Sequence, residues 1–186
     1  MKILSVKLKS VIITMTVILV VVFGIFMTAH MLSDAVSAEA RMIPIYNVET
    51  DENNVAVTFN CAVGNSDIDS ILATLDKYNV KATFFLLGSW AEAYPEEVQK
   101  IYDAGHEIGN HGYSHKDLPS MSFESILLDI QQCNETVKNI TGQYPVLLRA
   151  PSGAYDNKTI SAAESLGMIT IQWDVEPLAT VGNGYL

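Results

Sequence analysis

Beyond residue 54, short apolar segments alternate with longer segments whose apolar residues recur every three or four positions. The short segments predict strands at residues 55–59, 82–87, 107–110, 146–149 and 168–173. The longer segments predict helices that bury one face, at residues 68–78, 95–104, 122–141 and 156–166. Because no hairpin signal joins consecutive strands, the pattern predicts an α/β fold with a parallel sheet or barrel.

Polar residues and glycines support several of these helix boundaries. Ser122 and Gly142 bracket the longest helical segment, as an N-cap and a left-handed stop do. Gly105 is the expected stop of the preceding helix. Ser89 with Glu92 has the spacing of a capping box, which predicts a helix start near residue 89.

The N-terminus has a different pattern. Three lysines within the first nine residues precede an uncharged apolar run from Val11 to about Thr28. A helix of this length can cross a hydrocarbon core about 30 Å thick, and the lysines place its start in the cytoplasm. We therefore expect a cytoplasmic tip and transmembrane signal anchor at 1–30, a linker at 31–54 and an exported domain at 55–186. The alternative is a signal peptide cleaved after residues 36–38, which would release a secreted domain.

Composition removes one class of partner. The formal net charge of -10 leaves no basic face for phosphates, so we expect no nucleic-acid binding. The chain has two cysteines. Cys61 ends a strand segment and Cys133 lies on the apolar face of a helix, so each has an explanation other than a disulfide.

Polar residues follow the predicted strands at the points where the strands end. Parallel strands bring their carboxyl ends to one edge, which is where α/β proteins bind ligands. The residues found there are Asn60, Cys61, His111, His115, Arg149 and Asp174. His111 and His115 are four positions apart, so one helical turn would let both imidazoles bind one divalent metal.

Four ordered segments carry a resemblance to a known family. They are Val-Thr-Phe-Asn-Cys at 57–61, Asn-His-Gly-Tyr-Ser-His at 110–115, Arg-Ala-Pro-Ser-Gly at 149–153 and Trp-Asp-Val-Glu at 173–176. From about residue 41 onward, the chain resembles the polysaccharide deacetylases, also called carbohydrate esterase family four or the NodB-homology domain. The resemblance implies a distorted (β/α) barrel and a divalent metal, with zinc favoured. It also implies a polysaccharide substrate, peptidoglycan or a chitin-like glycan, that loses acetyl groups by hydrolysis.

The resemblance also implies roles for particular residues. His111 and His115 match two metal ligands, and Arg149 matches the arginine that orients the catalytic base. The position of the base itself is held by Asn60, and Asp174 is the other candidate catalytic residue. Ser152, Tyr155 and Trp173 are the candidates for contact with the sugar.

The first motif departs from the family, which has two aspartates there. Asn60 replaces the base, and an amide cannot accept a proton at neutral pH. Cys61 replaces a metal-binding aspartate, and it is either a thiolate ligand for zinc or a small buried thiol. A weaker alternative is a redox or metal-storage site formed by Cys61 and the histidines. Asp67 is either a substitute carboxylate, as metal ligand or base, or an N-cap. Asp174 either points inward or caps the end of a strand.

Later segments differ as well. Ser152 stands where the family has an aromatic residue, and residues 179–180 replace its Asp-Trp pair. No histidine follows His115 to serve as the general acid. We therefore expect a barrel that is incomplete at its C-terminus and a chain with little turnover. The two function classes left open are a metal-dependent deacetylase and a non-catalytic relative that binds cell-wall glycan.

Overall fold

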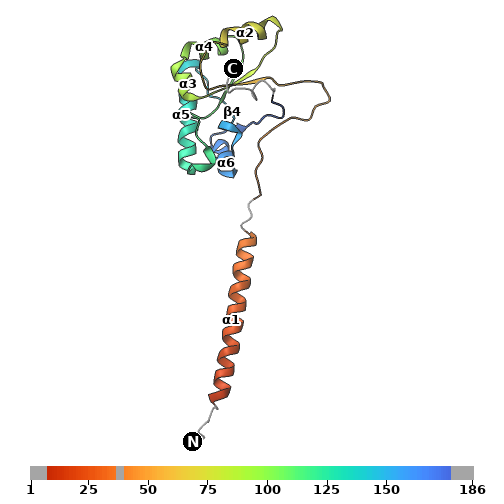
Figure 1. The fold of residues 1–186 in the computed structure, drawn as a ribbon, viewed down its shortest axis with the longest axis vertical. Coiled ribbons are helices and arrows are strands. Elements are labelled where there is room, and N and C mark those ends of the chain that lie inside the picture. The colour runs from red at the N-terminus through yellow and green to blue at the C-terminus, as the bar shows by residue number, and fades with distance from the viewer. Residues whose placement is uncertain (1–7, 37–39, 177–186) are drawn as a thin grey trace. The chain divides into compact units, whose positions relative to one another are not determined.

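A computed structural model of the chain describes residues 8–36 and 40–176 (Figure 1). The chain divides near Arg41 into two compact units, each described by itself below. The expected tip at 1–7, residues 37 and 38 of the cleavage site, and the departures at 179–186 lie outside the described residues.

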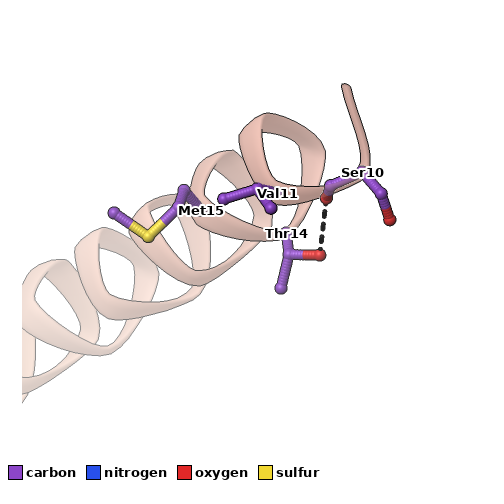
Figure 2. Close-up of a pocket in the computed structure, with 4 residues that line it drawn as sticks. All are labelled: Ser10, Val11, Thr14 and Met15. Carbon is purple, nitrogen blue, oxygen red and sulfur yellow. Dashed lines mark hydrogen bonds between the residues drawn. The ribbon is translucent and has the colours of Figure 1, made fainter. Parts of the chain in front are cut away.

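The first unit contains one long helix, α1 (Leu8–Val36). Its stretch from Ser10 to His30 is long and apolar enough to cross a membrane, a property that a signal sequence shares. The hydroxyl of Thr14 donates to the carbonyl of Ser10 at 2.9 Å (Figure 2). Thr16 and Thr28 make the same bond to the carbonyls four residues earlier. These bonds satisfy the hydroxyl groups of side chains that are exposed on α1.

The second unit is built on a parallel sheet, as the sequence pattern predicts. Its strands are β1 (Thr58–Cys61), β2 (Thr83–Leu86), β3 (Glu107–Asn110), β4 (Leu147–Leu148) and β5 (Ile169–Thr170). The strand order is β1-β2-β3-β4-β5, and every pairing is parallel. Each strand lies beside the next one in the sequence, which is the order found in (β/α) barrels. The prediction of a parallel α/β fold is confirmed.

Helices connect these strands. They are α2 (Ile68–Lys77), α3 (Gly88–Ala93), α4 (Pro95–Asp103), α5 (Phe123–Thr141) and α6 (Asn157–Ser165), with short 3₁₀ turns η1 (Leu118–Ser120) and η2 (Pro151–Gly153). The predicted caps of α5 are present: Ser122 accepts from the Ser125 N–H at 3.2 Å, and Gly142 has φ 80°. Figure 1 shows α3 and α5 running beside one another along one side of the sheet.

Two local predictions were wrong. The first strand begins at Thr58 rather than at residue 55, where the β-branched Val55 is 87% exposed and has no core to pack against. The capping box of Ser89 and Glu92 does not form, because α3 already begins at Gly88 with Leu87 as its N-cap. The Glu92 carboxylate instead accepts a hydrogen bond from the Tyr113 hydroxyl.

The sheet separates its residues onto two faces by alternation. Phe84 and Leu86 of β2 pack with Cys61, Trp90 and other helix-covered residues in one apolar cluster. A second cluster joins residues of α5, β4 and α6: Ile126, Ile130, Leu148, Ala162 and Ala163. Phe85 belongs to neither cluster, although it is fully buried. It lies on the opposite face, in register with Asn60 and Gly109.

Part of the segment expected to be a linker lies on this domain. α1 continues to Val36, and the second unit begins at Met42. Ile45 forms a parallel bridge with Ile171, its N–H donating to the Thr170 carbonyl at 2.9 Å and its carbonyl accepting from Gln172 at 2.8 Å. The polypeptide before residue 55 therefore extends the sheet on the side of β5.

Replacing Gly109 with alanine should strain the face that carries Phe85. A Cβ at this position would lie 2.5 Å from a ring carbon of Phe85, so the buried ring would have to move. We expect Gly109→Ala to lower the free energy of unfolding by about 1–3 kcal/mol, measured by urea denaturation of the full chain in detergent micelles. Asn139→Ala, at an exposed position of α5, is the control; equal stability of the two variants would contradict the packing described.

His106 should make the domain sensitive to acid. Its buried ring lies beside Phe84, and its Nδ1 accepts the Ala82 N–H at 3.3 Å. Burial, and secondarily the charge of Lys81, lowers the pKa of His106. The unfolded chain therefore takes up this proton at a higher pH than the folded chain does, and stability falls as pH drops below about 6.5.

Between pH 7 and pH 5, we expect the free energy of unfolding of His106→Gln to fall less steeply with pH than that of the unaltered chain. The difference in slope is at most about 1.4 kcal/mol per pH unit, the value for uptake of one proton. Urea titrations at several pH values measure the slope for both proteins. Identical slopes would show that His106 takes up its proton equally in the folded and unfolded states.

Candidate metal and catalytic site

The candidate residues gather where the strands end. His111 follows β3 directly, and its N–H donates to the carbonyl of Leu86, the last residue of β2, at 2.9 Å. Arg149 follows β4, and its N–H donates to the Asn110 carbonyl at 2.9 Å. Asn60 is the penultimate residue of β1. The carboxyl edge of the sheet therefore holds these side chains, as the sequence predicts for a parallel α/β protein.

His111 is held in one tautomer. Its Nδ1 lies 2.7 Å from the backbone carbonyl of Arg149. A carbonyl only accepts, so Nδ1 carries the proton and Nε2 keeps its lone pair. Burial lowers the pKa of His111 to about 4, against the opposing effect of the carbonyl bond. A neutral ring with a free Nε2 is the form of histidine that binds a metal.

His115 brings a second imidazole to the same place. The two ring centroids are 5.6 Å apart, with the ring planes at 77°. His115 has φ 52°, in the left-handed region that costs most residues about 1–2 kcal/mol. His115 is exposed to solvent, whereas His111 is buried. One imidazole is thus fixed in the protein and the other closes the pair from the solvent side.

Arg149 is a buried cation that reaches across the sheet to β1. Only 3% of it is exposed, and one guanidinium nitrogen donates to Thr58 Oγ1 at 2.9 Å and to Asn60 Oδ1 at 3.0 Å. The guanidinium lies 4.0 Å from the Phe85 ring centroid and 5.7 Å from that of Trp173. Burial lowers the pKa of Arg149 to about 10, so it stays charged at neutral pH.

Arg149 has no acidic partner among the residues that the structure describes. Its Nε is buried without a hydrogen bond, and within residues 40–176 no carboxylate forms an ion pair with it. Asn60 stands where a carboxylate would complete the pair, and it offers only a neutral amide oxygen. Burying an unpaired charge is costly, so this site carries an unfavourable electrostatic feature.

Cys61 lies away from the histidines. Being next to Asn60 in β1, it points to the opposite face and packs in the apolar cluster covered by helices. Burial, together with the charge of Asp67, raises the pKa of the Cys61 thiol to about 12. The thiol is therefore protonated at neutral pH, which favours the buried-thiol alternative over a thiolate ligand.

Asp67 is exposed and occupies the N-cap position of α2, but its side chain makes no capping bond. Across the described residues, no three side chains among His, Cys, Asp and Glu are arranged around one ion. The two imidazoles are donors of the kind that bind a divalent metal, and in this arrangement they are the two candidate ligands that lie together. A third ligand from Cys61 or Asp67 is not formed in this arrangement.

The remaining candidates surround the site unevenly. Trp173 lies over Arg149 and close to Gly153, whose added Cβ would be 2.8 Å from the indole. Tyr155 is half-buried, with its hydroxyl 3.1 Å from that of Tyr46. Asp174 and Ser152 are exposed, and the carboxylate of Asp174 lies 3.5 Å from the Asn47 amide. The structure thus brings Trp173 to the arginine and leaves Asp174 on the surface.

Sequence reasoning missed two residues that hold Arg149, namely Thr58 and Phe85. Thr58 precedes Asn60 by two positions, so alternation places both side chains on the same face of β1. Phe85 is the register partner of Asn60. Alternation along the predicted first strand could have identified Thr58, whereas the contact with Phe85 depends on strand pairing.

Comparison with known proteins agrees with this geometry. The family model described as polysaccharide deacetylase matches residues 47–171. YlxY, an uncharacterized protein of Bacillus subtilis, is 36% identical over 135 residues, which are 73% of this chain and 42% of YlxY. The peptidoglycan-N-acetylglucosamine deacetylase PgdA of Listeria monocytogenes is 36% identical over 66% of this chain and 26% of its own. This chain therefore spans less than half the length of either relative.

The solved structures include a protein described as a pseudoenzyme. BA3943 of Bacillus anthracis, described as a CE4 family pseudoenzyme, superposes with a TM-score of 0.68 at 34% identity over 70% of this chain and 47% of its own. A mutant of BA3943 with restored enzymatic activity superposes with a TM-score of 0.69 over 70% of this chain and 48% of its own. The family model covers more than half of the present sequence, and the fold and motif order agree with it. This chain belongs to the polysaccharide deacetylase family of hydrolases, carbohydrate esterase family four.

Proposed function

We propose that this protein is a metal-dependent hydrolase that removes acetyl groups from an N-acetylated cell-wall polysaccharide. The observation that carries the proposal is the pair of imidazoles at His111 and His115, next to Arg149 at the carboxyl edge of a deacetylase-family sheet. The name of PgdA favours peptidoglycan as the substrate over a chitin-like glycan.

In this proposal His111 and His115 hold a divalent metal, with zinc favoured. When bound there, such an ion lowers the pKa of a water ligand and polarises the acetyl carbonyl. His111 binds through Nε2, because its Nδ1–H is already donated to the Arg149 carbonyl. Trp173, which lies over the guanidinium of Arg149, offers an aromatic surface for a sugar ring, and Ser152 and Tyr155, which lie between β4 and α6, are the other candidates for sugar contact.

In this scheme Asn60 limits the rate of hydrolysis. Arg149 donates to its amide oxygen and fixes the side chain, but an amide cannot take a proton from water at neutral pH. In this scheme the histidine pair and Arg149 are retained, while residue 60 supplies no proton acceptor. We therefore assign the chain slow turnover, because general base catalysis contributes about 10²–10⁴-fold to rate.

A second candidate function is binding of cell-wall glycan without hydrolysis. Asn60 favours it, because the amide removes the base and leaves the fold and the histidine pair intact. The likeness to BA3943, whose description is that of a pseudoenzyme, supports the same alternative. In that case the metal and Trp173 would serve recognition only.

For localisation, we propose a single-pass membrane protein with the deacetylase domain outside the cytoplasm. The support is α1, which is long and apolar enough to span a bilayer, together with the lysines that precede its apolar run. A domain released after signal cleavage is the alternative, and a shortened mature chain in the culture medium would establish it.

Release of acetate tests the proposed activity. We expect the zinc-loaded full chain in detergent micelles to release acetate slowly from peptidoglycan, and His111→Ala to abolish the release because one of two metal-binding imidazoles is lost. Enzymatic quantification of acetate follows both proteins, with Asp76→Asn at an exposed position of α2 as the control. Glycan that binds without any acetate release would refute hydrolysis and establish the second function.

Supplying a carboxylate at residue 60 should raise both activity and stability. We expect Asn60→Asp to increase acetate release by about 10²-fold or more, since it provides a proton acceptor beside Arg149. The new ion pair should also raise the free energy of unfolding at pH 7 by about 1–3 kcal/mol. Arg149 would hold the pKa of that carboxyl below its usual value near 4, so the added stability is present above pH 4 and lost as pH falls further.

Asn60→Ala is the matched comparison, because it removes the acceptor for Arg149 without adding charge. Acetate release and urea denaturation at pH 7 and pH 3 are measured for all three proteins. If Asn60→Asp neither gains stability over the unaltered chain nor releases acetate faster, residue 60 is not the position of the base.

A further inference from the structure

The loop between the two histidines is held by a buried acid from another element. Asp129 lies on α5, and only 6% of it is exposed. Its Oδ2 accepts the Tyr113 N–H at 2.7 Å, and its Oδ1 accepts the Ser114 hydroxyl at 2.7 Å. Within residues 40–176 no Lys, Arg or His forms an ion pair with it. Both carboxylate oxygens are therefore used on the segment that separates His111 from His115.

This segment has an unusual backbone that needs outside support. Gly112 has φ 76° and His115 has φ 52°. On the side of α3, the N–H groups of Gly88 and Ser89 donate to the carbonyls of Gly112 and Tyr113 at 2.9 and 3.0 Å. On the other side stands Asp129, and a Cβ at Gly112 would lie 2.8 Å from its Oδ2. Glycine permits this approach, so the carboxylate can contact the main chain.

α5 is itself fixed at this point of the sheet. The buried Asn110 side chain donates to the Ile130 carbonyl at 2.9 Å and to Asn134 Oδ1 at 2.8 Å. Its own oxygen accepts the Gly112 N–H at 2.6 Å. Asp129 is thus carried by a helix that is hydrogen-bonded to the strand from which the histidine loop emerges. Its position relative to His111 is set by the fold.

We propose that Asp129 is a positioning residue that holds His115 in place for metal binding. Anchoring Tyr113 and Ser114 fixes the main chain immediately before His115 and maintains its left-handed conformation. Without the carboxylate, the exposed His115 would sample other conformations, and the pair would have to be ordered when the metal binds. This inference rests on the proposed metal site at His111 and His115.

A purely structural role makes a different prediction. An acid that only ties α5 to the loop would change the stability of metal-free and zinc-bound protein equally. A positioning role changes the affinity for the ion, because ordering His115 then becomes part of binding. Zinc affinity, measured apart from catalysis, separates the two.

The test is zinc binding by the full chain in detergent micelles, in competition with a chromophoric chelator. We expect Asp129→Ala, which removes both hydrogen-bond acceptors, to weaken zinc binding at least about tenfold, as removal of residues that support metal ligands does. Glu124→Gln, which removes an exposed acid from the same helix, should leave the affinity within about twofold, because charge alone acts weakly at the surface.

Ser114→Ala is a second variant, because Asp129→Ala could also disturb folding. It removes one of the two hydrogen bonds from an exposed residue, and we expect a loss of affinity of about threefold, with an unchanged circular dichroism spectrum. The double variant should bind zinc no more weakly than Asp129→Ala alone, since both substitutions remove the hydrogen bond between Ser114 and Asp129.

The outcomes distinguish this inference from the proposed function. Zinc binding by the unaltered chain that His111→Ala abolishes and Asp129→Ala weakens supports both. Zinc binding that His111→Ala abolishes but that stays equal in Asp129→Ala and Ser114→Ala overturns the role of Asp129 alone. An unaltered chain that binds no zinc, cobalt or manganese overturns the metal site and the positioning role together.

Discussion

The hydrogen bond from His111 Nδ1 to the Arg149 carbonyl is the interaction on which the site depends. It joins the residue after β3 to the residue after β4, two strands that share a single register pair. The same bond decides which imidazole nitrogen keeps a lone pair, and it does so through the main chain. A substitution of the Arg149 side chain would therefore leave the tautomer of His111 intact, provided that the backbone of β4 stays in place.

Alternation along β1 divides the two residues that depart from the family pattern. Asn60 faces Arg149, and Cys61 faces the helices, although they are neighbours in the sequence. One departure therefore changes the charge of the site, while the other changes the apolar core. The pKa of Cys61, raised to about 12, follows from that side of the sheet and needs no metal to explain it.

Much of the fold could be predicted from the sequence, because apolar period and caps are local signals. Ser122 and Gly142 mark α5 correctly, and the parallel sheet follows from strand and helix alternation. A helix start was predicted near residue 89, but the capping box behind it was wrong, because the N-cap of α3 is the apolar Leu87 and six residues are too few to show a period. In the site, His111 and Arg149 were recognisable from motifs. The proposed contribution of Asp129 was not recognisable, because its hydrogen bonds to the histidine loop are tertiary contacts. In the sequence alone, an acidic residue in a helix is indistinguishable from one exposed to solvent.

The unpaired charge of Arg149 separates two properties that usually occur together in a hydrolase. In the function proposed above, metal binding depends on the loop from 111 to 115, which is supported by α3 and α5. Proton abstraction depends in that scheme on residue 60 of β1, which is linked to the loop through Arg149. Losing the carboxylate at residue 60 removes a charge pair without disturbing a hydrogen bond of the histidine loop. The proposed function therefore allows ion and glycan binding to persist while hydrolysis is slow. The cost is a buried guanidinium with an unsatisfied Nε, and that cost falls on stability rather than on the metal site.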